Sequence, residues 1–239
     1  MSFAKDAFSG CHVLVIGGTS GIGAGIARAF AEHGAVVHVT GATAAEAAQA
    51  TGLDATVLDV RDNSAVSTLI NALDQLDVLV NCAGVIRRGR EHEPDVFADV
   101  ININLNGTQR CCAAARVLLA ARGGCIVNTA SMLSFFGGGL APGYSASKGG
   151  VAQLTKSLAI AYAAEGIRVN ALAPGWIATP LTLPLQQDAA RSDAILARTP
   201  LARWGTPADV AGAALFLASP AAAFVTGVVL PVDGGYLIT

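Results

Sequence analysis

Charged residues are scarce in this chain of 239 residues. Lys, Arg, Asp and Glu together make up 13% of the sequence, against roughly 25% in an average soluble domain. The formal net charge of −2 gives no electrostatic basis for binding nucleic acid or an anionic membrane. Because so few charges are available to cover the surface, we expect a deep core or extensive contacts between subunits.

Cysteine is also sparse, and its pattern excludes two common uses. The chain has five cysteines, an odd number, with no Cys-x-x-Cys pair and no regular spacing to His. This pattern predicts reduced thiols, several of them buried, in a cytoplasmic protein. No cluster offers four soft ligands at the spacing that zinc requires, so we expect no metal site.

Long uninterrupted apolar segments are missing as well. The N-terminus has no apolar signal segment. A charge-free run at 210–232 has the length of a membrane span, but prolines at 220 and 231 interrupt it. A helix to about Ala218, a turn at Ser219-Pro220 and a buried strand fit this run better. We therefore expect a soluble protein without a membrane segment.

Apolar runs rich in β-branched residues alternate with alanine-rich helical runs along the chain. The expected strands lie at 12–17, 35–40, 54–60, 77–83, 124–131, 167–174 and 227–233. The expected helices lie near 21–33, 44–51, 63–75, 95–121, 142–164, 186–198 and 207–218. Strict alternation predicts an α/β fold, a doubly wound parallel sheet of about seven strands with helices on both faces. We expect residues 1–239 to form a single domain, with a substrate lid inserted near 176–204.

A glycine-rich turn, Gly17-x-x-x-Gly21-x-Gly23, follows the first expected strand. Glycines let a phosphate approach the backbone, and the N-terminus of the next helix favours a pyrophosphate. We therefore expect nucleotide binding rather than a turn without ligand. The second expected strand ends in residues 40–43, Thr-Gly-Ala-Thr, which offer neither the acid that bonds the ribose of NAD nor the arginine that accommodates NADP. Ser20 is not basic either, so both cofactors stay open.

Tyr144 and Lys148 lie four residues apart in "PGYSASKGG", on one face of an expected helix. An ammonium group beside a phenol stabilises the phenolate and lowers its pKa from about 10. Such a tyrosine can exchange a proton with a substrate alcohol or carbonyl. The alternative is a surface tyrosine beside a solvated lysine. Ser131 at the end of the preceding strand, and Asn104 in mid-helix where Asn has poor propensity, favour a catalytic site.

Together these motifs resemble the short-chain dehydrogenase/reductase family over essentially the full length. The resemblance rests on the glycine turn, Asp59, "NCAG" (81–84), Asn104, Ser131, Tyr144-x-x-x-Lys148, "NALAPGWIAT" (170–179) and "VDGG" (232–235). It implies a Rossmann fold that binds NAD or NADP and transfers a hydride between the nicotinamide and a secondary alcohol or ketone. One departure is Ile16, where the family often has a threonine that could brace the turn.

The resemblance also implies roles for individual residues. Tyr144 would be the proton donor or acceptor, and Lys148 would bind the nicotinamide ribose and lower the tyrosine pKa. Ser131 would bond the reacting oxygen, and Asn104 would hold a water of the proton relay. The residues implied to bind the cofactor are Gly17, Ser20, Gly21, Ile22, Gly23, Ala42, Asp59, Val60, Asn81, Ala83, Gly84, Tyr144, Lys148, Pro174, Gly175, Ile177 and Thr179. Family members are commonly homo-tetramers, with the helices near 95–121 and 142–164 at one interface.

The substrate is less sharply indicated. "NCAGVIRR", "ASMLSFFGG" and "RTPLARWG" resemble the branch that oxidises sugar acids, namely the 2-deoxy-gluconate, gluconate and keto-deoxy-gluconate dehydrogenases. This predicts a sugar acid or hydroxylated keto acid as substrate, with Arg87, Arg88 and Trp176 at its site, since arginine can bind a carboxylate through two hydrogen bonds. A solvated loop or a subunit contact is the alternative role for the arginines.

Two other functions stay open. A 3-oxoacyl-carrier-protein-type or small-alcohol reductase would tolerate an apolar lid and would not need the arginines. A non-catalytic nucleotide-sensing protein on the same fold would lack one or more of Ser131, Tyr144 and Lys148, all of which are present.

Overall fold

A parallel β-sheet forms the centre of the molecule in the computed structural model, which describes residues 3–239. Within these residues the sheet has seven strands in the order β3-β2-β1-β4-β5-β6-β7, and every neighbouring pair is parallel. The strands are β1 (His12–Ile16), β2 (Val36–Gly41), β3 (Asp54–Val57), β4 (Val78–Asn81), β5 (Cys125–Thr129), β6 (Arg168–Pro174) and β7 (Val229–Val232). The strand order reverses between β1 and β4, which opens a crevice at their carboxyl ends.

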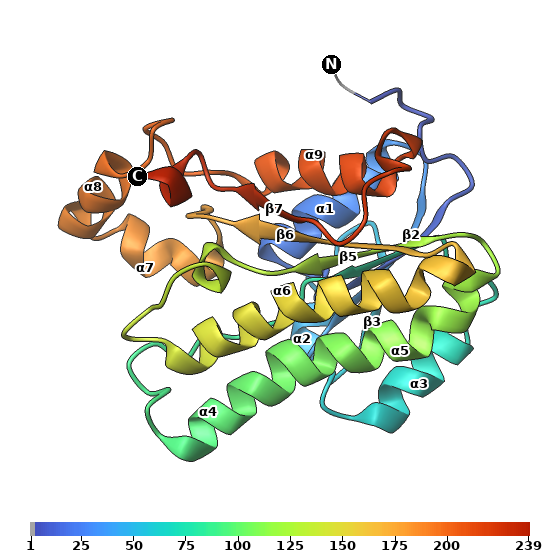
Figure 1. The fold of residues 1–239 in the computed structure, drawn as a ribbon, viewed down its shortest axis with the longest axis horizontal. Helices are drawn as coiled ribbons and strands as arrows, with labels where there is room; N and C mark the ends of the chain where they lie inside the picture. The colour runs from blue at the N-terminus through green and yellow to red at the C-terminus, as the bar shows by residue number, and fades with distance from the viewer. Residues whose placement is uncertain (1–2) are drawn as a thin grey trace.

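Helices cover both faces of this sheet. They are α1 (Gly21–Glu32), α2 (Ala44–Ala47), α3 (Asn63–Asn71), α4 (Pro94–Ile101), α5 (Gly107–Ala120), α6 (Pro142–Tyr162), α7 (Leu183–Gln186), α8 (Ala189–Ala197) and α9 (Pro207–Ala218). Figure 1 shows α1 and α9 on one face and α3 to α6 on the other, with α7 and α8 set apart beyond the end of β6. The doubly wound α/β fold expected from the alternation is confirmed.

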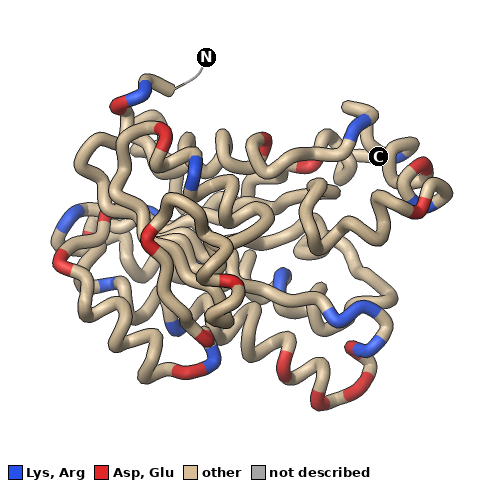
Figure 2. Tube along the Cα trace, turned by 180° about the vertical axis from the view of Figure 1, so that it is seen from behind, with Lys and Arg blue, Asp and Glu red and all other residues tan. Residues whose placement is uncertain are grey.

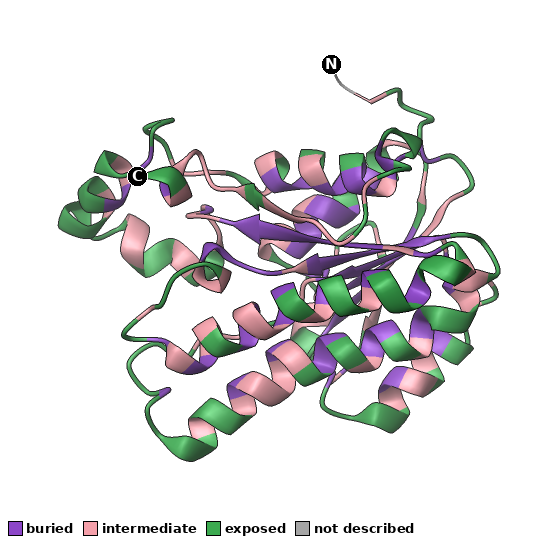
Figure 3. Cartoon of the chain, viewed as in Figure 1, coloured by how far each residue is buried: buried purple, intermediate pink, exposed green. Residues whose placement is uncertain are grey.

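The side chains of β1 show how the sequence divides the core. Val13 and Val15 pack with residues of α1 and α9, while Leu14 and Ile16 pack with residues of α3 and α5. All four are at most 2% exposed, and burying a side chain of this size contributes roughly 1.5–3 kcal/mol. Figure 3 shows the central strands buried, and the helices buried mainly along their inner faces. This explains why the central strands are apolar on both faces. The edge strands β3 and β7 are only partly buried.

The expected helix near 95–121 is present and contains an unusual turn. Between α4 and α5 the chain continues as a π-helical segment, Asn102–Asn106, which contains Asn104. The hydroxyl of Thr108 donates to the carbonyl oxygen of Asn104 at 2.8 Å. Such π-turns widen a helix locally and are frequent at functional sites.

Three elements are shorter than the sequence predicts. β3 ends at Val57 rather than at residue 60, because its only neighbour, β2, ends at Gly41, the partner of Val57. α2 spans four residues instead of the expected 44–51. The helix expected at 186–198 is present as α8, which begins at Ala189, and a separate short helix, α7, precedes it. Asp188 caps α8 by accepting from the backbone N–H of Arg191 at 3.2 Å.

The charge-free run at 210–232 folds into the expected helix, turn and strand, here α9, a short turn and β7. The expected burial of the strand is wrong, because β7 lies at the edge of the sheet and is only partly buried. Across residues 3–239, the structure contains no helix whose length and hydropathy would allow it to cross a membrane. Figure 2 shows basic and acidic residues mixed around the outside of the trace rather than separated into two faces.

Candidate active site

The turn between β1 and α1 is closely packed backbone. A Cβ atom at Gly17 would lie 2.6 Å from the backbone nitrogen of Ala83, and one at Gly23 would collide with the carbonyl oxygen of Gly17. α1 begins after Ser20, whose side chain makes no capping hydrogen bond. The first N–H groups of α1 are therefore not used by that side chain, and the turn fits a pyrophosphate. The Thr40 hydroxyl accepts from the Gly17 N–H at 3.2 Å, which supplies the brace expected of a threonine at position 16.

The segment after β6 lies opposite this turn. The Thr179 side chain would lie 3.6 Å from a Cβ atom at Gly21, and a Cβ at Gly175 would lie 2.6 Å from that of Asp233 in the "VDGG" segment. The turn after Thr179 is held by Thr182, whose hydroxyl donates to the Ile177 carbonyl at 2.6 Å. The expected cofactor residues that also line the cavity described below are Ile22, Tyr144, Pro174, Gly175, Ile177 and Thr179.

The remaining expected cofactor residues differ in what their side chains do. Asp59 lies beyond the end of β3 and pairs with Arg61 at 2.7 Å, and this hydrogen bond lowers the pKa of Asp59. Val60 is buried against Gly107 on α5. The Asn81 amide is buried and donates to Asn128 Oδ1 at 2.9 Å and to Cys112 Sγ at 3.3 Å. The side chains of Val60 and Asn81 therefore contribute to the core.

Asn104 connects the loop after β4 to α6. It is fully buried, its Oδ1 accepts from the Val85 N–H at 2.8 Å, and its Nδ2 donates to the Val85 carbonyl at 2.9 Å and to Ser147 Oγ at 3.0 Å. A Cβ atom at Gly84 would lie 3.3 Å from Asn104 Oδ1 and 3.6 Å from Lys148 Nζ. The π-turn thus places Asn104, Gly84 and Lys148 side by side.

Tyr144, Lys148 and Ser131 converge at the carboxyl ends of β5 and β6. Lys148 Nζ lies 5.6 Å from the centre of the Tyr144 ring and donates to the Thr129 carbonyl at 2.6 Å. Ser131 caps the short turn after β5 and lines the same cavity as Tyr144. The structure therefore brings together the three residues that the sequence singled out.

The pKa of Tyr144 differs from the lowered value that the sequence predicts. Burial raises the pKa of Tyr144 above its ordinary value, although the hydroxyl of Ser131 and the charge of Arg88 lower it, and Glu91 adds to the rise. Burial also lowers the pKa of Lys148 to about 8. The lowered tyrosine pKa expected from Lys148 is therefore absent, because removing the phenol from water outweighs its favourable contacts.

A cavity of about 580 Å³ opens in front of Tyr144 and Ser131. Apolar side chains make up most of its wall, among them Ile86, Met132, Leu133, Phe136, Leu140, Leu181 and Leu185. The segment 176–204 contributes residues from both of its short helices, including Pro184 on α7 and Arg191 on α8. No sequence pattern indicates Arg191, because the fold of this segment sets the direction of its helices.

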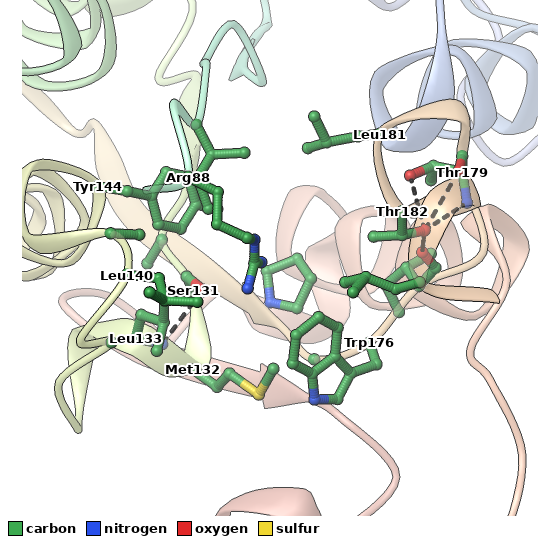
Figure 4. A pocket seen from close by; sticks show the side chains of 18 of the residues that line it. Arg88, Ser131, Met132, Leu133, Leu140, Tyr144, Trp176, Thr179, Leu181 and Thr182 are labelled. Atoms are coloured by element: carbon green, nitrogen blue, oxygen red, sulfur yellow. Dashed lines mark hydrogen bonds between the residues drawn. The ribbon is translucent and has the colours of Figure 1, made fainter. Parts of the chain in front are cut away.

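Arg88 is the arginine of the "IRRGR" segment that lines the cavity. Figure 4 shows its side chain extending between Tyr144 and Trp176, opposite the wall formed by Thr179 and Thr182. Its guanidinium carbon lies 5.9 Å from the centre of a Trp176 ring, close enough for a cation–π contact. Arg87 is exposed and is not among the residues that line the cavity.

A buried carboxylate holds the arginine segment against α6. Glu91 is 1% exposed, and its two oxygens accept from the N–H groups of Arg87 and Tyr144, each at 2.6 Å. α6 begins after Ala141, which provides no side-chain cap, so Glu91 supplies an acceptor to the first turn of this helix. Sequence reasoning missed Glu91, because nothing in the sequence shows that it contacts a residue 53 positions away.

The chain is similar to known proteins over nearly its full length. A family model described as enoyl-(acyl carrier protein) reductase matches residues 17–237. The 2-dehydro-3-deoxy-D-gluconate 5-dehydrogenase of Bacillus subtilis (strain 168) is 42% identical, with 99% of each chain covered. The cis-4-hydroxycyclohexanecarboxylate dehydrogenase of Sinomonas cyclohexanicum is 44% identical, covering 97% of this chain and 98% of its own.

The chain belongs to the short-chain dehydrogenase/reductase family. A solved structure from Agrobacterium tumefaciens, assigned as a 2-deoxy-D-gluconate 3-dehydrogenase with bound NADP, has a TM-score of 0.89 and 42% identity, and covers 98% of this chain and 99% of its own. This short-chain dehydrogenase/reductase is an NAD(P)-dependent oxidoreductase that acts on CH–OH groups, as the sequence motifs predicted.

Proposed function

We propose that this enzyme interconverts the secondary alcohol and the ketone of a hydroxy acid, with a sugar acid or hydroxylated keto acid as the substrate. The observation that carries this proposal is the position of Arg88 in the cavity, with the Tyr144 phenol and the Ser131 hydroxyl on the same cavity. A guanidinium can bind a carboxylate through two parallel hydrogen bonds. Several relatives are named as sugar-acid dehydrogenases, among them the one from B. subtilis.

The residues of the chain divide the chemistry between them. The glycine turn, Thr179 and the end of β2 would hold the dinucleotide, whose nicotinamide accepts or supplies the hydride when it is bound. Ser131 donates a hydrogen bond to the reacting oxygen, and Tyr144 takes the alcohol proton during oxidation or returns it during reduction. The Lys148 ammonium stabilises the phenolate that forms. Asn104 fixes the loop after β4 against α6, and its expected contact with a relay water stays a prediction.

A second substrate class is favoured by the composition of the cavity wall. Among the described residues, no Asp, Glu, Asn, Gln or His lines the cavity. Its polar side chains are the hydroxyls of Ser, Thr and Tyr residues, two arginines and one tryptophan. A polyhydroxylated chain therefore has few partners for its hydroxyls there, and each hydroxyl left unpaired costs about 1–3 kcal/mol. A hydroxy acid with an apolar ring would satisfy both the apolar wall and Arg88. The relative from S. cyclohexanicum is named for such a compound.

A substrate panel tests the proposal and separates the two classes. Sugar acids, hydroxycyclohexanecarboxylates, their carboxamides and β-hydroxyacyl thioesters are each offered with NAD⁺ and with NADP⁺, and reduced nicotinamide is followed by absorbance. We expect oxidation of hydroxy acids and much weaker oxidation of the carboxamides. Activity confined to thioesters would refute the proposal and support the acyl-carrier-protein-type reductase.

We further propose that the enzyme is a cytoplasmic homo-tetramer built from one domain, with residues 176–204 acting as a substrate lid. Five cysteines without disulfides, three of them buried, fit a reducing compartment. Val117 on α5 is 77% exposed and Ile160 on α6 is 82% exposed, which favours these helices as an interface. Sedimentation equilibrium of the wild type and of a Val117→Glu, Ile160→Glu variant tests the assembly.

A further inference from the structure

The end of β2 has no space for a side chain on residue 41. A Cβ atom at Gly41 would lie 2.9 Å from the Cβ of Glu46 and 3.0 Å from the Cγ2 of Thr19 in the glycine turn. α2 therefore packs Glu46 directly over the position where an acidic residue at the end of β2 would place its side chain. The sequence contains no acid at residues 40–43, but the fold brings one there from the next helix.

The carboxylate of Glu46 is held in place at this edge. Its Oε2 accepts from the N–H of Ala42 at 2.7 Å, and its own backbone N–H donates to Thr43 Oγ1 at 3.2 Å. Ala42 was expected to contact the cofactor, and its N–H group is one that a phosphate could have used. In the structure this donor is already bonded to a negative charge.

Few cations are available to offset that charge. Between Lys5 and Arg61 the sequence contains a single Lys or Arg, Arg28, which is exposed two turns into α1. Arg61 is bonded to two carboxylates, Asp59 at 2.7 Å and Asp99 at 3.0 Å. Both the glycine turn and the end of β2 therefore lack a base that could pair with a phosphate.

We propose that Glu46 makes this enzyme prefer NAD over NADP. In a dinucleotide-binding fold the adenosine ribose lies at the end of the second strand, where a carboxylate accepts a hydrogen bond from the ribose 2′-hydroxyl. The same carboxylate repels a 2′-phosphate. This inference rests on the proposed function only in requiring that a dinucleotide binds. A preference for NAD would distinguish this enzyme from the A. tumefaciens protein, whose structure contains NADP.

Dissociation constants measured by isothermal titration calorimetry, without substrate, test this inference. We expect the wild type to bind NAD⁺ at least about 10-fold more tightly than NADP⁺. Glu46→Gln retains an acceptor for the Ala42 N–H, and should tighten NADP⁺ binding about 5-fold or more. It should weaken NAD⁺ binding about 2- to 5-fold, because an amide oxygen accepts a weaker hydrogen bond from the ribose 2′-hydroxyl than a carboxylate does. Glu32→Gln removes the same charge from an exposed residue at the far end of α1, and should change neither constant.

Ionic strength provides a second measurement that needs no variant. Salt screens the repulsion, so the preference of the wild type for NAD⁺ should shrink as salt rises, while that of Glu46→Gln should not. A wild type that binds NADP⁺ as tightly as NAD⁺, or a Glu46→Gln variant with an unchanged ratio, would overturn the inference. Lack of hydroxy-acid oxidation would refute the proposed function and leave this ratio intact.

Discussion

Replacing Glu91 tests whether one buried carboxylate maintains both the helix that carries Tyr144 and the loop that carries Arg88. Glu91 accepts two backbone hydrogen bonds of 2.6 Å, from Arg87 and from Tyr144, and is 1% exposed. In Glu91→Ala both N–H groups lose their acceptor inside the protein. Each buried donor left unsatisfied costs about 1–3 kcal/mol, so the loss of both acceptors should lower the free energy of unfolding by about 2–6 kcal/mol.

Glu91→Gln separates the charge from the shape of this side chain. The amide oxygen can still accept one of the two hydrogen bonds, while the amide NH₂ group faces the other N–H. We therefore expect a smaller loss of about 2–3 kcal/mol. Glu91 raises the pKa of Tyr144, while Ser131 and Arg88 lower it. Removing the Glu91 charge should therefore lower the pKa of Tyr144 and shift the pH profile of oxidation to lower pH. Lys148, 5.6 Å from the centre of the tyrosine ring, is unchanged in this variant.

Urea denaturation measures the stabilities, and the Michaelis constant for a hydroxy acid measures how well Arg88 is held. Glu93→Gln is the matched control, since Glu93 is exposed and pairs with Arg90 at 3.4 Å, and it should cost less than about 0.5 kcal/mol. A Glu91→Ala variant within about 1 kcal/mol of the wild type would show that Glu91 does not hold α6 and the arginine loop together.

Two further predictions concern the residues around the reacting oxygen. Tyr144→Phe should lower kcat about 10²- to 10⁴-fold and leave the affinity for NAD⁺ nearly unchanged; a normal kcat in single-turnover experiments would contradict proton transfer by Tyr144. Folding lowers the pKa of Lys148 from 10.5 to about 8. As pH rises, Lys148 therefore loses its proton in the folded protein before it does so in the unfolded chain. The free energy of unfolding should increase by about 3 kcal/mol between pH 8 and 10.5 as a result. Lys148→Met should abolish this increase in pH-dependent denaturation curves, and a variant with an equal increase would show that the lysine is not its source.

The sequence predicts the fold well because the fold depends on repeated local patterns. β1 shows this clearly, since its continuous apolar residues fill the two helical layers on either side of the sheet. The Tyr144 and Lys148 pair is equally accessible to prediction, because the spacing of four residues is a property of one helix.

Long-range contacts explain what the sequence could not predict. Glu91 and Glu46 look like ordinary surface charges until the fold places one at the start of α6 and the other over the end of β2. The different positions of Arg87 and Arg88 depend on the path of one loop. The raised pKa of Tyr144 depends on how deeply the phenol is buried, which neighbours in the sequence do not determine.

The proposed substrate class depends on recognition of a carboxylate by Arg88, in the cavity that Tyr144 also lines. The most direct measurement compares kcat/KM for a hydroxy acid and for its neutral carboxamide, in the wild type, Arg88→Ala and the exposed control Arg87→Ala. Because a hydrogen bond to a charged group contributes about 1.5–3 kcal/mol, Arg88→Ala should lower kcat/KM for the acid about 10- to 100-fold. It should leave the carboxamide within about 3-fold, and Arg87→Ala should leave both substrates within that range. Equal losses for acid and carboxamide, or no loss in Arg88→Ala, would show that Arg88 does not bind the substrate carboxylate.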